Sequence, residues 1–110
     1  MVGTQQFVHI GEHAFIAGGS LVRKNVPPYV KAAREPLSYV GVNSVGLRRR
    51  GFSDQQIMNI EDIYRVVYVQ NSNITTAMKV ADIELPLSEE KDTILDFIKG
   101  STKGIMRGLS

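Results

Sequence analysis

Residues 10–22 read IGEHAFIAGGSLV, and this stretch decides how the amino-terminal part of the chain folds. Within it, Ile10, Ile16 and Val22 recur at every sixth position. A spacing of six fits neither the period of an α-helix nor the alternation of a single strand. It is typical of the hexapeptide repeat, in which each group of six residues forms one side of a parallel β-coil.

Four consecutive hexads run from Thr4 to Pro27, and they read TQQFVH, IGEHAF, IAGGSL and VRKNVP. We expect the branched first positions to point inward, and the compact fifth positions (Val8, Ala14, Ser20 and Val26) to lie near tight corners. The alternative is two ordinary strands with glycine turns, which four hexads obeying both rules disfavour. Repeat folds need about three stacked units. We therefore expect the last turn of a longer β-helix, or a coil that packs on other subunits.

The sequence divides into three parts at two changes of pattern. Because Pro27 and Pro28 remove two backbone donors, we expect strand pairing to stop there. Residues 1–27 are then the last coil, and residues 28–42 are a connector. We expect residues 31–42 of this connector to form either a loop or an extended segment. Residues 43–110 carry helical periodicity. The predicted fold class is the end of a parallel β-helix followed by an all-α domain of three to four helices.

Capping residues place the expected helices. Ser53 with Gln56 forms a capping-box pattern ahead of the apolar stripe Ile57, Ile60, Tyr64, Val67 and Tyr68. The other elements are a short helix from Asn43 to Gly51, a turn at 71–73, a helix over about 75–84, and a helix after Ser88 that Gly100 interrupts.

Composition excludes several classes of function. The 110 residues are 43% hydrophobic, so a single cored domain is the default. The chain has no cysteine, so it has neither a disulfide nor a thiol nucleophile, which agrees with a reducing cytoplasm. No apolar run approaches membrane-spanning length. A net charge of +2, with no aromatics among the basic residues, gives no indication of nucleic-acid binding.

Two basic clusters have both a structural and a functional interpretation. Arg48, Arg49 and Arg50 are either cations at the end of a helix or a phosphate-recognising group. Lys99, Lys103 and Arg107 would share one face if this end were helical. That face is either solvated or a docking surface for an acidic partner.

His9 and His13 are the only imidazoles in the chain. In the hexad frame both occupy outward positions, and no carboxylate or third ligand has a convincing spacing. We expect ordinary exposed histidines, with neither a metal site nor a catalytic role.

Three stretches together resemble the UDP-N-acetylglucosamine acyltransferase family of lipid A synthesis: QQFVHIGEHAFIAGGSLVRKNVPPYV, GVNSVGLRRRGFS and STKGIMRG. The resemblance covers the whole chain as the carboxy-terminal portion of such an enzyme. It implies a cytoplasmic homotrimer of left-handed parallel β-helices with helical carboxy-terminal domains. The implied reaction moves a 3-hydroxyacyl group from acyl carrier protein to the sugar 3-hydroxyl of UDP-N-acetylglucosamine. It implies no cofactor beyond the phosphopantetheine of the carrier protein.

The resemblance also implies roles for individual residues. Gln5, Gln6, Asn43, Arg49 and Arg50 match positions that contact the sugar nucleotide, and Gly18 matches a glycine that measures acyl-chain length. Arg48, Arg49 and Arg50 are the expected docking group for the carrier protein. The chain departs from the family pattern at Gln5 (histidine expected), Val45 (acid expected) and Glu61 (base expected).

The catalytic histidine of the family lies in an earlier coil, and neither His9 nor His13 matches it. We therefore expect the chain alone to be inactive although the whole protein is an acyltransferase. Two alternatives stay open. One is a different hexapeptide acyltransferase, such as the N-acyltransferase of the same pathway. The other is a non-catalytic module for trimerisation or for carrier-protein binding.

Overall fold

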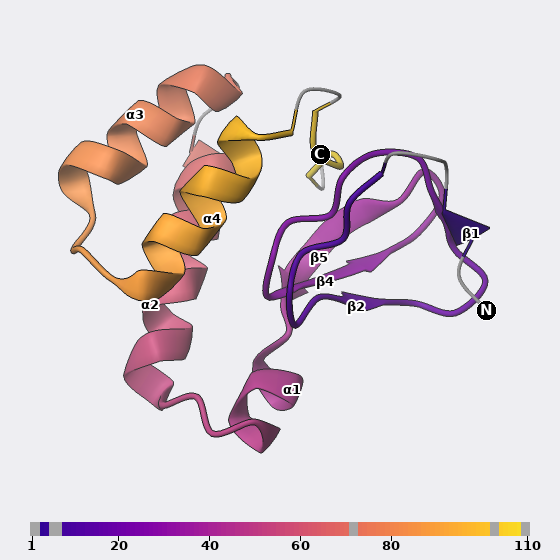
Figure 1. The fold of residues 1–110 in the computed structure, drawn as a ribbon, viewed down its shortest axis with the longest axis horizontal. Helices are drawn as coiled ribbons and strands as arrows, with labels where there is room; N and C mark the ends of the chain where they lie inside the picture. The colour runs from indigo at the N-terminus through magenta and orange to yellow at the C-terminus, as the bar shows by residue number, and fades with distance from the viewer. Residues whose placement is uncertain (1–2, 5–7, 71–72, 102–103, 109–110) are drawn as a thin grey trace.

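In Figure 1, a stack of extended segments lies beside a group of helices. This arrangement comes from a computed structural model that describes residues 3–4, 8–70, 73–101 and 104–108. Within these ranges, no helix is both long enough and apolar enough to cross a membrane.

The extended segments form a coil of parallel strands. β1 (Gly3–Thr4) pairs in parallel with β3 (Leu21–Val22), and Gly3 lies opposite Leu21, eighteen residues later. β2 (Phe15–Ile16) pairs in parallel with β4 (Val30–Ala33). A repeat of eighteen residues is three hexads, so the six-residue spacing does stack one coil on another, as predicted.

The fourth hexad does not keep the six-residue spacing. Thr4 pairs with Val22 but Ile10 bridges Val26, sixteen residues later, so the side that begins at Val22 has only four residues, VRKN, before the next first position. Val26 therefore stacks as a first position, and both Val26 and Val22 are fully buried. Among the other branched first positions, Ile16 is partly buried and Ile10 is 42% exposed.

The prediction that strand pairing stops at the prolines is also wrong. Pro27 and Pro28 lie buried at a corner, and pairing resumes at once in β4. The corner is tight, because a Cβ on Gly11 would lie 2.4 Å from the nitrogen of Pro28. Residues 38–42 then form β5 (Ser38–Val42), which returns antiparallel beside β4, so the connector is an extended hairpin.

Three of the helices begin at the predicted caps, and the third α-helix is capped instead by Asn73, which was predicted to lie in a turn. α1 (Ser44–Arg49) follows Asn43, and α2 (Asp54–Arg65) follows a complete capping box at Ser53. α2 continues into a π-helix (Val66–Gln70), which the sequence pattern did not predict. α3 (Ile74–Glu84) and α4 (Glu89–Lys99) complete the group, with Ser88 capping α4.

The carboxy-terminal segment corrects the prediction of an all-α domain. After α4 the chain returns to the coil, where Ile105 bridges Asn25 and Arg107 bridges Ser38. The basic helical face predicted from Lys99, Lys103 and Arg107 does not form, since α4 ends at Lys99. Lys103 lies outside the described residues.

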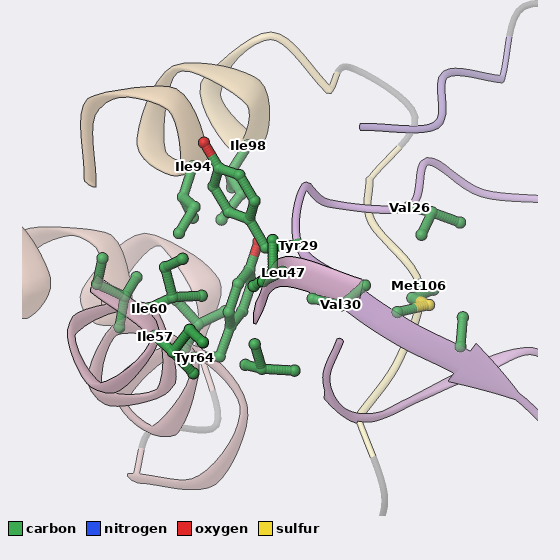
Figure 2. Close-up of a cluster of buried hydrophobic side chains, with 14 of the residues drawn as sticks. Val26, Tyr29, Val30, Leu47, Ile57, Ile60, Tyr64, Ile94, Ile98 and Met106 are labelled. Carbon is green, nitrogen blue, oxygen red and sulfur yellow. The ribbon is translucent and has the colours of Figure 1, made fainter. Parts of the chain in front are cut away.

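One hydrophobic core joins the coil to the helices. Figure 2 shows side chains from α2 and α4 meeting Tyr29 and Leu47 at the junction, while Val26, Val30 and Met106 lie on the coil side. Leu47, Ile57, Ile60, Tyr64 and Ile94 are buried to 1% exposure or less. Because the two parts share this core, helix α1 is held rigidly against the edge of the coil.

Candidate functional site: a basic cleft

A cleft of about 490 Å³ opens where the coil meets α1. Its walls come from the corner before β2, from β4 and from α1. Its polar residues are His13, Lys31, Asn43, Arg49 and Arg50, and its other residues are Ala14, Phe15, Val45 and Gly46. These residues are distant in the sequence, and the shared core brings them together.

Asn43 fixes α1 to the coil. Its side-chain oxygen accepts a hydrogen bond from the Gly46 amide at 3.3 Å, which caps the helix. Its side-chain nitrogen donates to the main-chain oxygen of His13 at 3.1 Å, and its main-chain N–H donates to the main-chain oxygen of Tyr29 at 2.8 Å. A side-chain amide has two N–H donors and two acceptor lone pairs. One donor and one lone pair therefore remain for a bound molecule.

Gly46 has to be glycine for this arrangement. A Cβ at this position would lie 2.5 Å from the side-chain nitrogen of Asn43. Only a missing side chain lets the cap close while the amide still reaches the coil.

His13 is not the ordinary exposed histidine that the hexad frame predicted. Its ring stacks on Tyr29 with centroids 5.9 Å apart, and it meets the Phe52 ring edge-to-face with centroids 5.3 Å apart. Its Nδ1 lies 3.0 Å from Nη1 of Arg50. Burial raises the pKa of the Tyr29 hydroxyl, so that ring stays neutral. His9, in contrast, is exposed.

The cleft is strongly positive. Lys31, Arg49 and Arg50 contribute three cations, and no residue that lines the cleft is acidic. Among the described residues, no carboxylate lies within ion-pair distance of these three cations. Arg48 differs, because its Nε donates to Asp54 at 3.1 Å on the outer surface. Since guanidinium groups bind phosphate through paired hydrogen bonds, the cleft suits a phosphate-bearing molecule.

The structure separates the predicted site residues into three groups. Asn43, Arg49 and Arg50 line the cleft together. Gly18 lies in an exposed turn before β3 and is not part of the cleft wall, and Arg48 pairs with Asp54 and does not line the cleft either. Gln5 and Gln6 lie outside the described residues.

Sequence reasoning missed Lys31, Phe15 and the role of His13. The alternation of buried Val30, exposed Lys31 and buried Ala32 was a usable signal for Lys31, but it required a strand after the prolines. Phe15 is 56% exposed and provides an apolar wall. No local pattern reveals the His13–Arg50 contact, which spans thirty-seven positions.

A second cavity, of about 460 Å³, lies between the coil and the carboxy-terminal segment. Its walls include the apolar residues Leu21, Leu37 and Met106 and the basic residues Arg23, Lys24 and Arg107. Of these cations, Arg23 is already bound to Glu35 at 2.6 Å. Because this cavity offers no comparable group of unpaired cations, the basic cleft is the better candidate site.

No group of three or more metal-ligating side chains occurs within the described parts of the chain. The polar residues of the basic cleft are three cations, an imidazole and an amide. This donor set favours an anion over a metal ion.

Comparison with known proteins gives one consistent result. A family model described as "Udp N-acetylglucosamine O-acyltransferase; Domain 2" matches residues 25–106. A curated relative from Myxococcus xanthus, an acyl-(acyl-carrier-protein)–UDP-N-acetylglucosamine O-acyltransferase, is 36% identical over 107 residues. That alignment covers 97% of this chain and 42% of the relative.

Solved structures agree with this result. A UDP-N-acetylglucosamine acyltransferase from Bacteroides fragilis superimposes with a TM-score of 0.93 at 43% identity, over 96% of this chain and 42% of the other. A structure from Acinetobacter baumannii gives a TM-score of 0.88 at 31% identity, with the same coverage. The chain thus spans about two fifths of the length of the relatives that it matches.

Proposed function

The chain belongs to the UDP-N-acetylglucosamine O-acyltransferase family, and from this premise we propose that it is the carboxy-terminal portion of such an enzyme. The whole protein would move a 3-hydroxyacyl chain from acyl carrier protein to the sugar 3-hydroxyl of UDP-N-acetylglucosamine. The family model and the names of the relatives favour this O-acyltransferase over the N-acyltransferase alternative.

One observation carries the proposal, namely the group of unpaired cations in the basic cleft. Lys31, Arg49 and Arg50 converge there from the coil and from α1 without an acidic neighbour in the cleft wall. Both substrates carry phosphate, either as the diphosphate of the nucleotide or as the phosphodiester of phosphopantetheine. We assign this part of the chain the task of binding phosphate, with Asn43 offering its remaining donor and acceptor.

The acid–base step belongs elsewhere in the whole protein. A general base needs a free acceptor within hydrogen-bond reach of the hydroxyl that it deprotonates. In His13 the Nδ1 atom already faces Arg50, and the ring is packed between Tyr29 and Phe52. We therefore propose that the 110-residue chain binds substrate without turning it over.

Further assignments follow from family membership and remain proposals. The whole protein is a homotrimer of left-handed β-helices, with Gly18 limiting acyl-chain length and with Gln5 and Gln6 contacting the sugar nucleotide. Arg48 joins Arg49 and Arg50 in docking the carrier protein. The protein needs no cofactor beyond the phosphopantetheine of its substrate, and it acts in the cytoplasm, which agrees with the absence of cysteine.

The test is calorimetric titration of the 110-residue chain with UDP-N-acetylglucosamine and, separately, with acyl carrier protein. We expect Arg49→Gln and Arg50→Gln each to weaken the binding of at least one of them about tenfold or more, because each removes a charge-assisted hydrogen bond. Arg48→Gln is the matched control for the nucleotide, since Arg48 lies outside the cleft. Weakening by Arg48→Gln for the carrier protein alone would support the docking assignment.

The outcomes separate the alternatives. Binding of neither substrate would contradict the phosphate-binding proposal and favour a structural module. Release of acylated UDP-N-acetylglucosamine by the isolated chain would contradict the proposal that the base lies elsewhere.

A further inference from the structure

His13 lies in an unusual backbone conformation beside the basic cleft. Its φ angle is +57°, in the left-handed region that residues with a Cβ seldom adopt. The neighbouring contacts hold it there. The His13 oxygen accepts from Asn43 at 3.1 Å, and the Glu12 oxygen accepts from the Tyr29 amide at 2.9 Å. This conformation directs the imidazole toward the carboxy-terminal end of α1, where Arg50 is the capping residue.

The chemistry of the contact assigns the tautomer of His13. Arginine has only donors, so Nη1 of Arg50 donates and Nδ1 of His13 accepts over 3.0 Å. A hydrogen bond in this direction requires a neutral imidazole with its proton on Nε2. That nitrogen lies 3.7 Å from a carboxylate oxygen of Glu12, on the side away from Arg50.

A neutral acceptor can orient Arg50 without neutralising its positive charge, which a carboxylate partner could not do. A carboxylate would orient Arg50 but would also neutralise it, as Asp54 does for Arg48 at 3.1 Å. An imidazole orients the guanidinium and leaves its full positive charge for an anion. Arg48 and Arg50 thus have different kinds of partner. Of these two, Arg50, whose partner is neutral, lines the cleft, and Arg48, whose partner is a carboxylate, does not.

We propose that His13 is a positioning residue that holds Arg50 ready for phosphate through Nδ1, as a neutral Nε2–H tautomer. The proposal rests on the assignment of the cleft as a phosphate site. A preoriented guanidinium loses less side-chain freedom when the anion binds, so affinity is higher than for a mobile one. His13 touches no substrate in this role and acts only through Arg50.

Two variants separate positioning from packing. His13→Asn keeps an acceptor, because Oδ1 of asparagine is bonded to Cγ just as Nδ1 is, and asparagine tolerates a left-handed φ. It loses the ring that stacks on Tyr29 and meets Phe52 edge-to-face. His13→Phe keeps the ring and loses the acceptor. A positioning role predicts that asparagine preserves function better than phenylalanine does, and a packing role predicts the reverse order.

The first measurement needs no variant. In ¹⁵N spectra of the 110-residue chain at neutral pH, we expect His13 to show an unprotonated Nδ1 and a protonated Nε2. We also expect separately resolved Arg50 guanidinium signals, which His13→Phe averages and His13→Asn retains. A proton on Nδ1, or Arg50 signals that His13→Phe leaves unchanged, would overturn the proposal.

The second measurement is titration with inorganic pyrophosphate. We expect His13→Phe to weaken binding about threefold to tenfold and His13→Asn to weaken it less. In an Arg50→Gln background, His13→Phe should cause no further loss, because its only route to the ligand is gone. The control His9→Phe alters the other, exposed histidine and should leave binding unchanged.

The two measurements distinguish an error in the phosphate site from an error in the role of His13. If wild-type chain does not bind pyrophosphate, the phosphate site is wrong, and the spectra still decide whether His13 holds Arg50. If pyrophosphate binds but His13→Phe weakens it equally with and without Arg50, His13 does not act through Arg50 and the inference is overturned.

Discussion

The hydroxyl of Tyr64 donates a 2.6 Å hydrogen bond to the main-chain oxygen of Pro28, which joins α2 to the corner of the coil. Tyr64 has no exposed surface, and Pro28 is buried with it. The proline corner therefore does more than turn the chain, because its carbonyl group fastens the helices to the coil.

Removing this hydroxyl should weaken the junction. Tyr64→Phe leaves a buried carbonyl without the donor that serves it, so we expect the free energy of unfolding to fall by about 1–3 kcal/mol. Urea denaturation followed by circular dichroism measures the change. Tyr39→Phe is the control, because among the described residues the Tyr39 hydroxyl has no hydrogen-bond partner. An equal loss in both variants would show that the bond to Pro28 contributes nothing specific.

Alkaline pH should destabilise the protein through three stacked tyrosines, Tyr39, Tyr64 and Tyr68. Burial, aided by nearby Glu61, raises the pKa of Tyr39 to about 12. Burial also raises the pKa values of Tyr64 and Tyr68.

The sign of the effect follows from proton binding. Tyrosine in an unfolded chain loses its proton near pH 10, whereas the folded state keeps its three protons to higher pH. Stability is therefore at its full value below about pH 10 and falls as the pH rises above it. Denaturation series at increasing pH, with tyrosinate absorbance as a second signal, test this. Constant stability well above pH 10 would contradict it.

Lys91 should be a stabilising buried cation. Its side chain is 1% exposed, and its Nζ donates to the main-chain oxygens of Asp82 at 2.8 Å and Leu85 at 3.0 Å. It thereby binds carbonyl groups at the end of α3, where a cation is favoured. We expect Lys91→Met to lower the free energy of unfolding by about 1–3 kcal/mol.

Lys79→Met is the matched control for Lys91→Met. It makes the same substitution at an exposed position of the neighbouring helix α3, so its effect should stay within about 0.5 kcal/mol. If Lys91→Met were as stable as the wild type, the cost of burying the ammonium group would equal the benefit of its hydrogen bonds.

Gly46→Ala should destabilise the protein, although alanine has the higher helix propensity. Alanine is normally better than glycine inside a helix by about 1 kcal/mol. At Gly46, however, the new Cβ would lie 2.5 Å from the side-chain nitrogen of Asn43. We expect lower thermal stability and weaker nucleotide binding, because the cap of α1 and its link to His13 are displaced together.

Gly100→Ala provides the comparison for Gly46→Ala. Gly100 ends α4 with an ordinary helical φ of −79°, and its nearest contact to a new Cβ would be 3.4 Å. It should leave both stability and binding nearly unchanged. A stabilising effect of Gly46→Ala would mean that Asn43 can move without cost.

The sequence predicted the local elements well, since they depend on near neighbours. The caps at Asn43, Ser53 and Ser88 lie where the predicted helices begin. The six-residue spacing correctly indicated a stacked coil. The predictions were wrong where tertiary packing overrode a rule that considers only neighbouring residues. The prolines did not end pairing, because a corner of the coil needs no amide donor at those positions.

Only some of the predicted site residues are neighbours in the structure, and for the same reason. Asn43, Arg49 and Arg50 lie together because they share one short helix, which the sequence could locate. Lys31 reaches the same cleft because the chain shortens its last coil by two residues and continues into β4. The spacing of residues along the sequence does not predict that shortening.

By itself, the sequence determined which segments coil, which form helices and where each helix begins, because apolar spacing and capping groups act over a few residues. Only the tertiary structure decided that His13 faces Arg50 and that Tyr64 reaches Pro28. Both contacts join segments more than thirty residues apart. Their existence depends on how the shared core sets the helices against the coil, and that geometry is fixed by packing among all the elements at once.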